Sequence, residues 1–249
     1  MRPRRSVSLV VPLHNEEKNL PHLLDLFVEA LGLEADEFEV VLVDDASTDG
    51  TPALASARAE SDPRIRVVTH AVNRGLGGAL RSGFAEARLD WVLYTDCDLP
   101  WDPREVGRAF RAAEITGADF VSGYRHDRTG EGSLRTVYSL LYNGLIHFAF
   151  DFPIRDVNFS CKLFRRSLLL GLPLRSEGSF IDAELLVRCR NRGAVFQQIG
   201  LDYFPRTRGV STLSSPTVIL RILRDFLTLL PDLRGERPEK TEKAEKAGP

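Results

Sequence analysis

Short runs of β-branched residues alternate with longer amphipathic stretches from residue 6 to about residue 123 of this chain. The runs that we expect to form strands are Ser6–Pro12, Glu39–Val43, Ile65–Thr69, Trp91–Thr95 and Asp119–Ser122. The stretches that we expect to form helices are Glu17–Leu31, Thr51–Glu60, Gly75–Arg88 and Pro103–Thr116. Strands and helices that alternate in this way build a mostly parallel sheet with helices on both faces. The sequence therefore predicts an α/β fold.

The composition agrees with a globular α/β domain and excludes several other classes of protein. The chain has 249 residues, of which 43% are hydrophobic and 27% are charged, so it can bury a core of its own. These proportions exclude a disordered, collagen-like or disulfide-scaffold protein. The formal net charge is -2, so the chain lacks the overall basic charge with which a protein grips nucleic acid. We expect no nucleic-acid partner.

The cysteines and the N-terminus bear on the cellular compartment. Cys97, Cys161 and Cys189 are odd in number and have no C-x-x-C spacing, which fits a reducing compartment and argues against structural zinc. The basic N-terminus is followed by an apolar stretch from Val7 to Leu13 only, too short for a signal peptide. No segment reaches the length of about 18 apolar residues that a membrane span needs. We expect a cytoplasmic protein.

The alternation gives way to less regular segments after residue 123. Val137–Phe152 is apolar and aromatic, and Arg155–Phe164 is expected to be a mixed polar turn. Phe180–Arg192 is expected to be a helix and Val195–Gly200 a strand. Pro216–Leu230 is expected to be a helix whose apolar residues nearly encircle it.

Polar and acidic residues gather directly after each of the first five expected strands. These segments are residues 12–17, 44–50, 73–78, 96–100 and 123–125. Sheets of this kind bind ligands outside the carboxyl ends of their strands. We therefore expect the five segments to converge on one pocket.

Asp96-Cys97-Asp98, directly after the fourth strand, is the most informative of these segments. Two carboxylates at this spacing on a turn can share a hard divalent cation such as Mg²⁺ or Mn²⁺ and leave coordination sites for phosphate oxygens. A turn with two solvated acids is the plain alternative. The position of the pair at the end of a strand favours the metal site.

Asp44 and Asp45, at the end of the second strand, have two interpretations. Thr48 or Asp49 can cap the helix that begins near Thr51, which makes the acidic segment a local structural device. A carboxylate upstream of that cap can also accept the N–H of a nucleobase or a ribose hydroxyl. The sequence leaves both interpretations open.

The glycines of Asn73–Ala79 open a helix. They let the backbone approach either a phosphate or a neighbouring segment closely, and the sequence does not choose between the two. The segment lacks the third glycine of a dinucleotide fingerprint and follows the third strand instead of the first. The loop after the first strand has no glycine at all, which argues against a sugar-nucleotide nucleotidyltransferase.

Taken together and in order, four segments carry a family resemblance: Val11–Glu17, Val43–Thr51, Asn73–Gly75 and Asp96–Leu99. They closely resemble the family 2 glycosyltransferases, which have the GT-A fold. Within that family the chain looks most like the dolichyl- or polyprenyl-phosphate sugar transferases, the dolichol-phosphate mannose synthase group. The resemblance covers roughly residues 6–213. It implies a Rossmann-like GT-A domain over residues 1–213, whose C-terminal part lies on the acceptor side. We expect an amphipathic helix over residues 214–232 and a disordered charged tail over residues 233–249.

The resemblance implies roles for individual residues of the donor site. Asp96 and Asp98 would bridge the ribose, a Mg²⁺ or Mn²⁺ ion and the diphosphate, with Asp98 the principal catalytic residue. Arg125 and Arg206 match arginines that face the donor phosphates, a task for which the planar guanidinium is suited. The other residues expected around the nucleotide sugar are Pro12, His14, Glu16, Val43, Asp44, Asp45, Arg74 and Cys97.

Two positions depart from the pattern of that group, and both concern the donor phosphates. Pro100 stands where the group often has glutamine, two places after the second aspartate. Thr212 stands where the group often has lysine, after the late serine.

Asp182 and Glu184 are the candidate catalytic acids on the acceptor side, because the family has an acidic residue in this region. A hydroxyl acceptor would need such a group as a general base. A phosphate acceptor is already largely ionised and needs it less. An acidic first helical turn that complements the helix dipole is the structural alternative.

Two apolar segments bear on the acceptor and its location. Val137–Phe150 is rich in aromatic residues, and Ile219–Leu227 has arginines beside leucine and phenylalanine. Such helices can lie in a bilayer interface, pack on the domain, or pack on a second subunit. Peripheral contact with the inner face of the membrane and a homo-oligomer are both consistent with the sequence.

The sequence thus predicts an inverting, metal-dependent glycosyltransferase. It would move a sugar from a nucleotide-diphosphate donor, GDP-mannose or a UDP-sugar, to a polyprenyl phosphate. Two alternatives stay open: the same fold acting on a soluble hydroxyl acceptor, and a nucleotide-sugar-binding protein without turnover.

Overall fold

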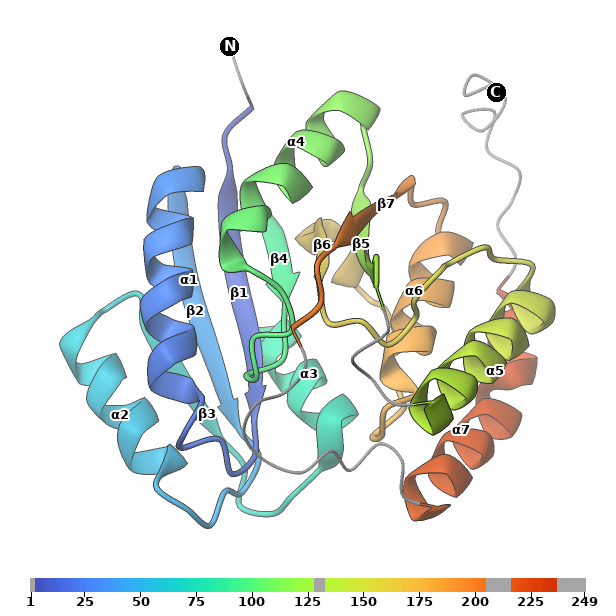
Figure 1. Cartoon of the computed structure of the whole chain (residues 1–249), viewed down its shortest axis with the longest axis horizontal. Coiled ribbons are helices and arrows are strands. Elements are labelled where there is room, and N and C mark those ends of the chain that lie inside the picture. Colours follow the sequence, from blue (N-terminus) through green and yellow to red (C-terminus); the bar gives the residue numbers. More distant parts are fainter. Residues whose placement is uncertain (1–2, 128–132, 205–215, 237–249) are drawn as a thin grey trace.

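The computed structural model describes residues 3–127, 133–204 and 216–236, and its centre is strand β1 (Ser6–Leu13). Every residue of β1 except Pro12 is buried, because the strand has neighbours on both sides and helices on both faces (Figure 1). A strand so enclosed must be almost continuously apolar, which explains its composition.

Seven strands of the described chain form one sheet in the order β3-β2-β1-β4-β6-β5-β7. Besides β1 they are β2 (Glu37–Asp44), β3 (Ile65–Thr69), β4 (Trp91–Tyr94), β5 (Phe120–Arg125), β6 (Lys162–Arg165) and β7 (Phe196–Leu201). Only β6 runs antiparallel to its neighbours β4 and β5. The expected mostly parallel sheet is confirmed.

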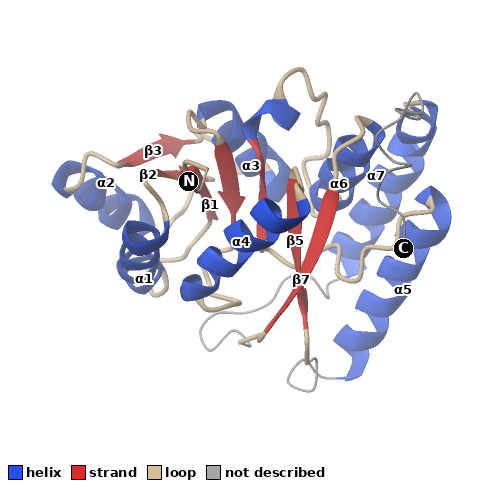
Figure 2. Cartoon of the chain, turned by 90° about the horizontal axis from the view of Figure 1, so that it is seen from above, coloured by secondary structure: helices blue, strands red, loops and turns tan. Residues whose placement is uncertain are grey.

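Helices cover both faces of the sheet, as expected. The described helices are α1 (Leu20–Glu34), α2 (Thr51–Ser61), α3 (Gly75–Glu86), α4 (Val106–Thr116), α5 (Ser133–Phe150), α6 (Ile181–Asn191) and α7 (Pro216–Gly235). One hydrophobic cluster holds buried residues of α1, α2 and α4, and a second holds those of α3, α5, α6 and α7. Figure 2 shows α1 and α4 on one side of the sheet and α3 and α6 on the other. Among the described helices, none combines the length and hydrophobicity needed to cross a bilayer.

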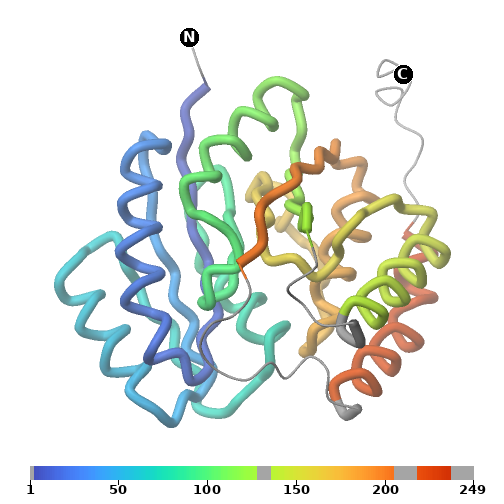
Figure 3. The backbone as a smooth tube through the Cα atoms, viewed as in Figure 1, coloured from blue at the N-terminus to red at the C-terminus, as the bar shows by residue number. Residues whose placement is uncertain are grey.

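The parallel strands end level with one another. Leu13 of β1 lies beside Asp44 of β2, and Asp44 lies beside Thr69 of β3. The segments that follow these strands therefore leave from one edge, which can be traced at the bottom of Figure 3. Local sequence sets where each strand ends, and the register then brings the ends together.

β6 corrects the expectation that residues 155–164 form only a polar turn. Its four residues, beginning with Lys162, pair with β4 and β5. Local pattern gave little signal for this strand, because it is short and starts with a charged residue. Pairing on both edges of the backbone supplies the stability that the sequence pattern does not indicate.

α7 passes through Pro231 to Gly235, beyond both the expected helical pattern, which ends at Leu230, and the expected helix segment, residues 214–232, so the expected disordered tail over residues 233–249 is wrong for its first residues. A proline within a helix removes a backbone hydrogen bond, which is why the sequence suggested an end at Leu230. Here tertiary contacts hold the last turn. Asn191 donates to the carbonyl oxygen of Leu233 at 2.7 Å, and Arg234 donates to that of Ala149 at 3.1 Å.

The glycines at the start of α3 pack against protein backbone. The amide of Gly77 donates to the carbonyl oxygen of Glu177 at 2.9 Å. A Cβ atom on Gly77 would lie 2.1 Å from the carbonyl oxygen of Ser176, and one on Gly75, whose φ is +72°, would lie 2.5 Å from that of Glu177. Of the two open interpretations of these glycines, close approach to a neighbouring segment is therefore realised in the structure.

This packing predicts that Gly77→Ala destabilises the fold by about 1–3 kcal/mol, because the obstructing atom is a backbone oxygen that cannot rotate away. Gly32→Ala in α1 is the matched control. Nothing lies within 4 Å of its Cβ position, so it should be neutral or stabilising by up to about 1 kcal/mol. Urea denaturation of both variants checks this, and equal effects would contradict the packing.

Candidate functional site

The segments after β1 and β2 are joined to each other by side-chain hydrogen bonds. The side-chain oxygen of Asn15 accepts the amide of Thr48 at 2.8 Å, and a carboxylate oxygen of Glu17 accepts the amide of Gly50 at 2.9 Å. Asn15 itself has a φ of +58°, a left-handed conformation that asparagine tolerates better than most residues. The two segments therefore form one rigid unit at the carboxyl edge of the sheet.

Asp44 and Asp45 are buried within this unit and are engaged by protein groups. Asp44 accepts the amide of Ser47 at 3.1 Å. One oxygen of Asp45 accepts the Arg74 amide at 2.8 Å and lies 2.7 Å from Nδ1 of His70. Asp45 thus fixes the segment between β3 and α3 to the end of β2. The expected caps Thr48 and Asp49 do not occupy the N-cap of α2, which is Gly50 without a side-chain cap hydrogen bond, although Asp49 accepts the amide of Thr51 at 2.9 Å.

Asp96 and Asp98 follow β4 on a turn that is held in place by hydrogen bonds from a buried tryptophan. The indole N–H of Trp101, a fully buried side chain, donates to the hydroxyl of Thr95 at 3.1 Å and to the carbonyl oxygen of Ser160 at 3.0 Å. Leu99 takes a φ of +53°, which reverses the chain directly after Asp98. The two carboxylates are therefore displayed on a preorganised turn.

Negative charge is concentrated around Asp96. The hydroxyl of Tyr94 donates to its Oδ1 at 3.1 Å. Burial, together with the negative charges of Asp98 and Asp182, raises the pKa of Asp96 to about 7. A cation bound here would relieve this repulsion and favour the ionised carboxylate.

The pair suits a cation that takes part of its coordination from a ligand. The described residues contain no group of three or more His, Cys, Asp or Glu side chains arranged to hold a metal by themselves. Mg²⁺ in particular is commonly held by one or two carboxylates together with phosphate oxygens. Asp96 and Asp98 supply the protein share of such a site.

Lys162 is a residue that the sequence reasoning did not select. Its side chain has no solvent exposure, and its Nζ lies 2.7 Å from Oδ1 of Asp182. The same Nζ donates to the carbonyl oxygen of Phe159 at 2.8 Å and lies 5.4 Å from the ring centre of Tyr94. Its signal in the sequence was a lone lysine beside apolar residues. Lys162 thus places a buried positive charge beside Asp182 and the ring of Tyr94, whose hydroxyl donates to Asp96.

The two candidate acids of α6 are both engaged by protein groups. Asp182 is paired with Lys162, and burial raises its pKa despite that partner. Glu184, with no solvent exposure, accepts the amides of Arg175 and Ser176 and the Nε of Arg188 at distances of 2.8–3.0 Å. This geometry favours a structural role for Glu184 over that of a general base.

Arg125 is buried and interacts with protein groups. Its Nε lies 3.1 Å from a carboxylate oxygen of Asp156, and its guanidinium lies over the ring of Tyr203 at 4.9 Å. To contact the donor phosphates, the guanidinium of Arg125 would have to bind them and Asp156 at the same time. Arg206 and Thr212 lie outside the described residues.

The remaining predicted donor residues differ in accessibility. Pro12 and Val43 are register partners on β1 and β2, and Nδ1 of His14 lies 2.9 Å from the carbonyl oxygen of Asp45. The side chain of Cys97 belongs to the hydrophobic core, although its neighbours Asp96 and Asp98 do not. Two further residues share this edge: Glu16, which accepts from Asn19, and the exposed Arg74.

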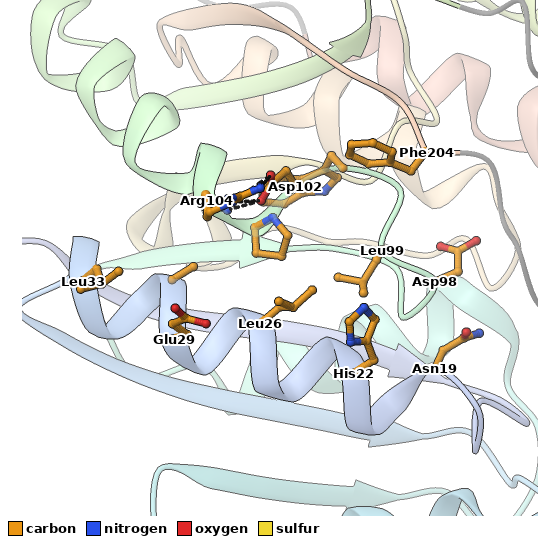
Figure 4. Close-up of a pocket in the computed structure, with 13 residues that line it drawn as sticks. Asn19, His22, Leu26, Glu29, Leu33, Asp98, Leu99, Asp102, Arg104 and Phe204 are labelled. Atoms are coloured by element: carbon orange, nitrogen blue, oxygen red, sulfur yellow. Dashed lines mark hydrogen bonds and ion pairs between the residues drawn. The ribbon is translucent and has the colours of Figure 1, made fainter.

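A groove of about 470 Å³ extends from Asp98 along α1. Figure 4 shows Asp98 near one end of this groove and Leu33 at the other, with Leu99 above the helix. Its polar side chains include the acids Glu29, Asp98 and Asp102. Arg104 also lines the groove and pairs with Asp102, so the charge beside its apolar side chains is mixed.

A comparison with protein families decides the classification of this site. The sequence profile of glycosyl transferase family 2 matches residues 8–171, which include the segments after β1, β2, β3 and β4. The chain belongs to glycosyl transferase family 2. The resemblance seen in the sequence is confirmed.

Two curated relatives show sequence similarity within the family. Glycosyltransferase AglD of Haloferax volcanii is 33% identical over 207 residues, which cover 80% of this chain and 33% of the relative. An undecaprenyl-phosphate 4-deoxy-4-formamido-L-arabinose transferase of Yersinia pestis is 31% identical over 169 residues, which cover 67% of this chain and 51% of the relative. The chain thus spans a third to a half of the length of these relatives.

A solved structure supports the fold over nearly the whole chain. Glucosyl-3-phosphoglycerate synthase from Mycobacterium tuberculosis, in complex with Mn²⁺, UDP-glucose and phosphoglyceric acid, aligns with a TM-score of 0.71 at 23% identity. The alignment covers 95% of this chain and 82% of that protein. At this identity the likeness concerns the fold, and it confirms the GT-A architecture.

The buried pair predicts that Lys162→Met destabilises the fold by about 3–5 kcal/mol, because the Asp182 carboxylate is left buried without its partner. Lys162→Met combined with Asp182→Leu should recover much of this loss. The exposed pair of Arg4 and Glu37 has the same 2.7 Å separation, so Arg4→Met should cost about 1 kcal/mol or less. Urea denaturation measures all three, and equal losses for the two single variants would contradict the argument.

The pKa of Asp96 predicts a pH dependence in buffer that contains EDTA. Its folded pKa of about 7 exceeds the ordinary value of 3.8, so between these values the folded chain holds a proton that the unfolded chain has lost. Stability contributed by this group therefore falls as pH rises from about 4 to about 7. The free energy of unfolding of Asp96→Asn, relative to that of wild type, should rise by about 1–3 kcal/mol between pH 5 and pH 8, as measured by urea denaturation. Parallel pH profiles would contradict it.

Proposed function

We propose that this chain transfers a sugar from a nucleotide-diphosphate donor to a polyprenyl phosphate, with inversion at the anomeric carbon. The observation that carries the proposal is the meeting of two acidic segments, one after β2 and one after β4, at the carboxyl edge of the sheet. Ligands of open α/β sheets bind at this edge. The Yersinia pestis relative is named for transfer to undecaprenyl phosphate, which supports the acceptor class.

The donor would lie across the ends of β1, β2 and β4. The rigid unit after β1 and β2 would hold the base and ribose, with Asp44 and Asp45 organising its backbone. Asp96 and Asp98 would hold Mg²⁺ or Mn²⁺ together with the diphosphate. The solved structure crystallised with Mn²⁺ and UDP-glucose supports this arrangement through its fold. When bound, such a cation supplies positive charge against the negative charge that builds up on the leaving diphosphate.

The reaction needs no proton acceptor when the acceptor is a phosphate. An oxygen of the acceptor phosphate attacks the anomeric carbon, the bond from that carbon to the donor phosphate oxygen breaks, and the nucleoside diphosphate leaves with the electron pair. A hydroxyl acceptor would in addition have to lose a proton to a base. Asp182 and Glu184 are both engaged in ion pairs, which supports the phosphate acceptor over the hydroxyl acceptor.

An acceptor of this class would bring the chain to a membrane surface. Exposed apolar side chains on α5 and α7 support such contact, among them Leu140, Phe148, Leu220 and Leu227. Figure 1 shows these two helices side by side at one end of the molecule.

The proposal predicts a metal-dependent rise in melting temperature with one class of nucleotide diphosphate sugar. A ligand at about 100 times its dissociation constant stabilises the native state by about 2.7 kcal/mol. We expect this shift with one of the UDP-, GDP- or dTDP-sugars in the presence of Mn²⁺, and its loss in Asp98→Ala.

Asp62→Ala is the matched control, because Asp62 pairs with Arg64 at the surface, away from this edge. It should keep the ligand-induced shift. Absence of a shift with every nucleotide sugar in wild type would reject the proposed donor site. A shift accompanied by transfer to water-soluble hydroxyl acceptors, and not to isoprenyl phosphates, would favour the alternative acceptor.

A further inference from the structure

Tyr94, the last residue of β4, is a buried tyrosine that is hydrogen-bonded to one acid of the proposed donor site. Its side chain is 1% exposed, and its hydroxyl donates to Oδ1 of Asp96 at 3.1 Å. Alternate side chains of a strand point to the same face of the sheet, so residues 94 and 96 are placed to meet. A hydrophobic side chain would fill this position without the cost of burying a hydroxyl. The hydroxyl therefore has a task that packing does not require.

A second hydroxyl, that of Ser160, bonds to the same carboxylate from another part of the chain. Ser160 is 2% exposed and lies two residues before Lys162, the register partner of Tyr94 on β6. Alternation along the chain directs Ser160 and Lys162 to one face, and antiparallel pairing places that face beside Tyr94. Asp96 thus receives hydrogen bonds both from β4 and from the segment that leads into β6.

Both hydroxyls are themselves held in place by packing and hydrogen bonds. The carbonyl oxygen of Ser160 accepts the indole N–H of Trp101 at 3.0 Å. The ring of Tyr94 meets that of Phe84 edge to face, with the ring centres 6.4 Å apart, and Nζ of Lys162 lies 5.4 Å from its centre. The two donors therefore restrain the Asp96 carboxylate before any ligand binds.

Such restraint has a chemical consequence for a cation at Asp96 and Asp98. No group of three potential His, Cys, Asp or Glu ligands is found in the described part of the chain, so binding would depend on how accurately these two carboxylates are placed. Carboxylates that bind metals are commonly held by hydrogen bonds of their own, and loss of such a partner weakens metal binding by about 10–100-fold.

We propose that Tyr94 and Ser160 are positioning residues of the donor site, which orient the Asp96 carboxylate toward a divalent cation. This inference rests on the proposed function and deepens it. Neither hydroxyl touches the cation or the donor, because each acts through Asp96. The sequence pattern selected neither residue, since Tyr94 resembles any aromatic residue of a buried strand and Ser160 lies in an irregular segment.

Electron paramagnetic resonance of free Mn²⁺ tests this inference in titrations with MnCl₂, with UDP and GDP added in separate series. Tyr94→Phe should weaken Mn²⁺ binding by about tenfold or more, and so should Ser160→Ala, because each removes one restraint on the carboxylate. Urea denaturation verifies that each variant is folded under the conditions of the titration.

Each variant has a matched control that removes a buried hydroxyl with no hydrogen bond. The hydroxyls of Tyr142 and Ser122 are buried and have no partner among the described residues. Tyr142→Phe and Ser122→Ala should therefore bind Mn²⁺ as wild type does. An equal fall in Mn²⁺ affinity in both tyrosine variants would overturn the role of Tyr94, and an equal fall in both serine variants would overturn that of Ser160.

Displacement of bound Mn²⁺ by Mg²⁺ and by Ca²⁺ separates orientation from a general loss of structure or charge. Mg²⁺ requires nearly ideal octahedral geometry, whereas Ca²⁺ accepts a flexible set of oxygen ligands. Orientation by Tyr94 therefore predicts that Tyr94→Phe lowers the affinity for Mg²⁺ by a larger factor than the affinity for Ca²⁺. Equal factors for the two cations would overturn the role in orientation.

Asp98→Ala separates this inference from the proposed function. Mn²⁺ binding that is lost in Asp98→Ala but unchanged in Tyr94→Phe and Ser160→Ala would overturn the positioning role and leave the donor site standing. Wild-type protein that binds no Mn²⁺ with either nucleotide would reject the proposed metal site and this inference together.

Discussion

The carboxyl end of β4 lies beside several buried acids, and a buried lysine, Lys162, neutralises one of them, Asp182. Lys162 pairs with Asp182 and lies beside Tyr94, which donates to Asp96. Negative charge of this density would be unstable in a protein interior without a counter-charge. The antiparallel direction of β6 supplies it, because β6 begins at the edge where β4 ends and Lys162 is the register partner of Tyr94. The first residue of the reversed strand thus supplies the partner of Asp182 next to the end of β4.

The segment around Ser176 connects the two sides of the molecule. Its backbone packs on the glycines of α3, and the Arg74 amide at the start of that helix is held by Asp45. On its other side the Ser176 hydroxyl lies 2.8 Å from a carboxylate oxygen of Asp225 in α7. The carboxylate of Glu184 in α6 accepts the backbone amide of Ser176 and so also holds this segment. This segment thus connects the carboxyl edge of the sheet, where the donor is proposed to bind, with helix α7. Glu184 in α6 therefore has a structural role in holding the segment instead of the role of a base.

Much of this arrangement was predictable from local pattern. The five strands from β1 to β5 are regular apolar runs, and the acids after β2 and β4 stand where a parallel sheet places its ligands. Family membership followed from the order of these segments, although each is weak by itself. By contrast, the sequence pattern places β6 within a turn and gives α7 an end at Leu230 or at residue 232, short of Gly235. Both errors have one cause, since hydrogen bonds from distant residues hold these elements in place.

The sequence by itself determined the α/β fold and the position of the acidic segments at the carboxyl edge of the sheet, because these depend on periodicity and on the order of strands along the chain. Tertiary structure decided what individual charged groups do. Arg125 faces Asp156, Glu184 faces backbone amides, and Lys162 is buried beside Asp182. Such assignments depend on which side chains meet across elements far apart in the sequence. The spacing of residues along the chain does not indicate these tertiary contacts.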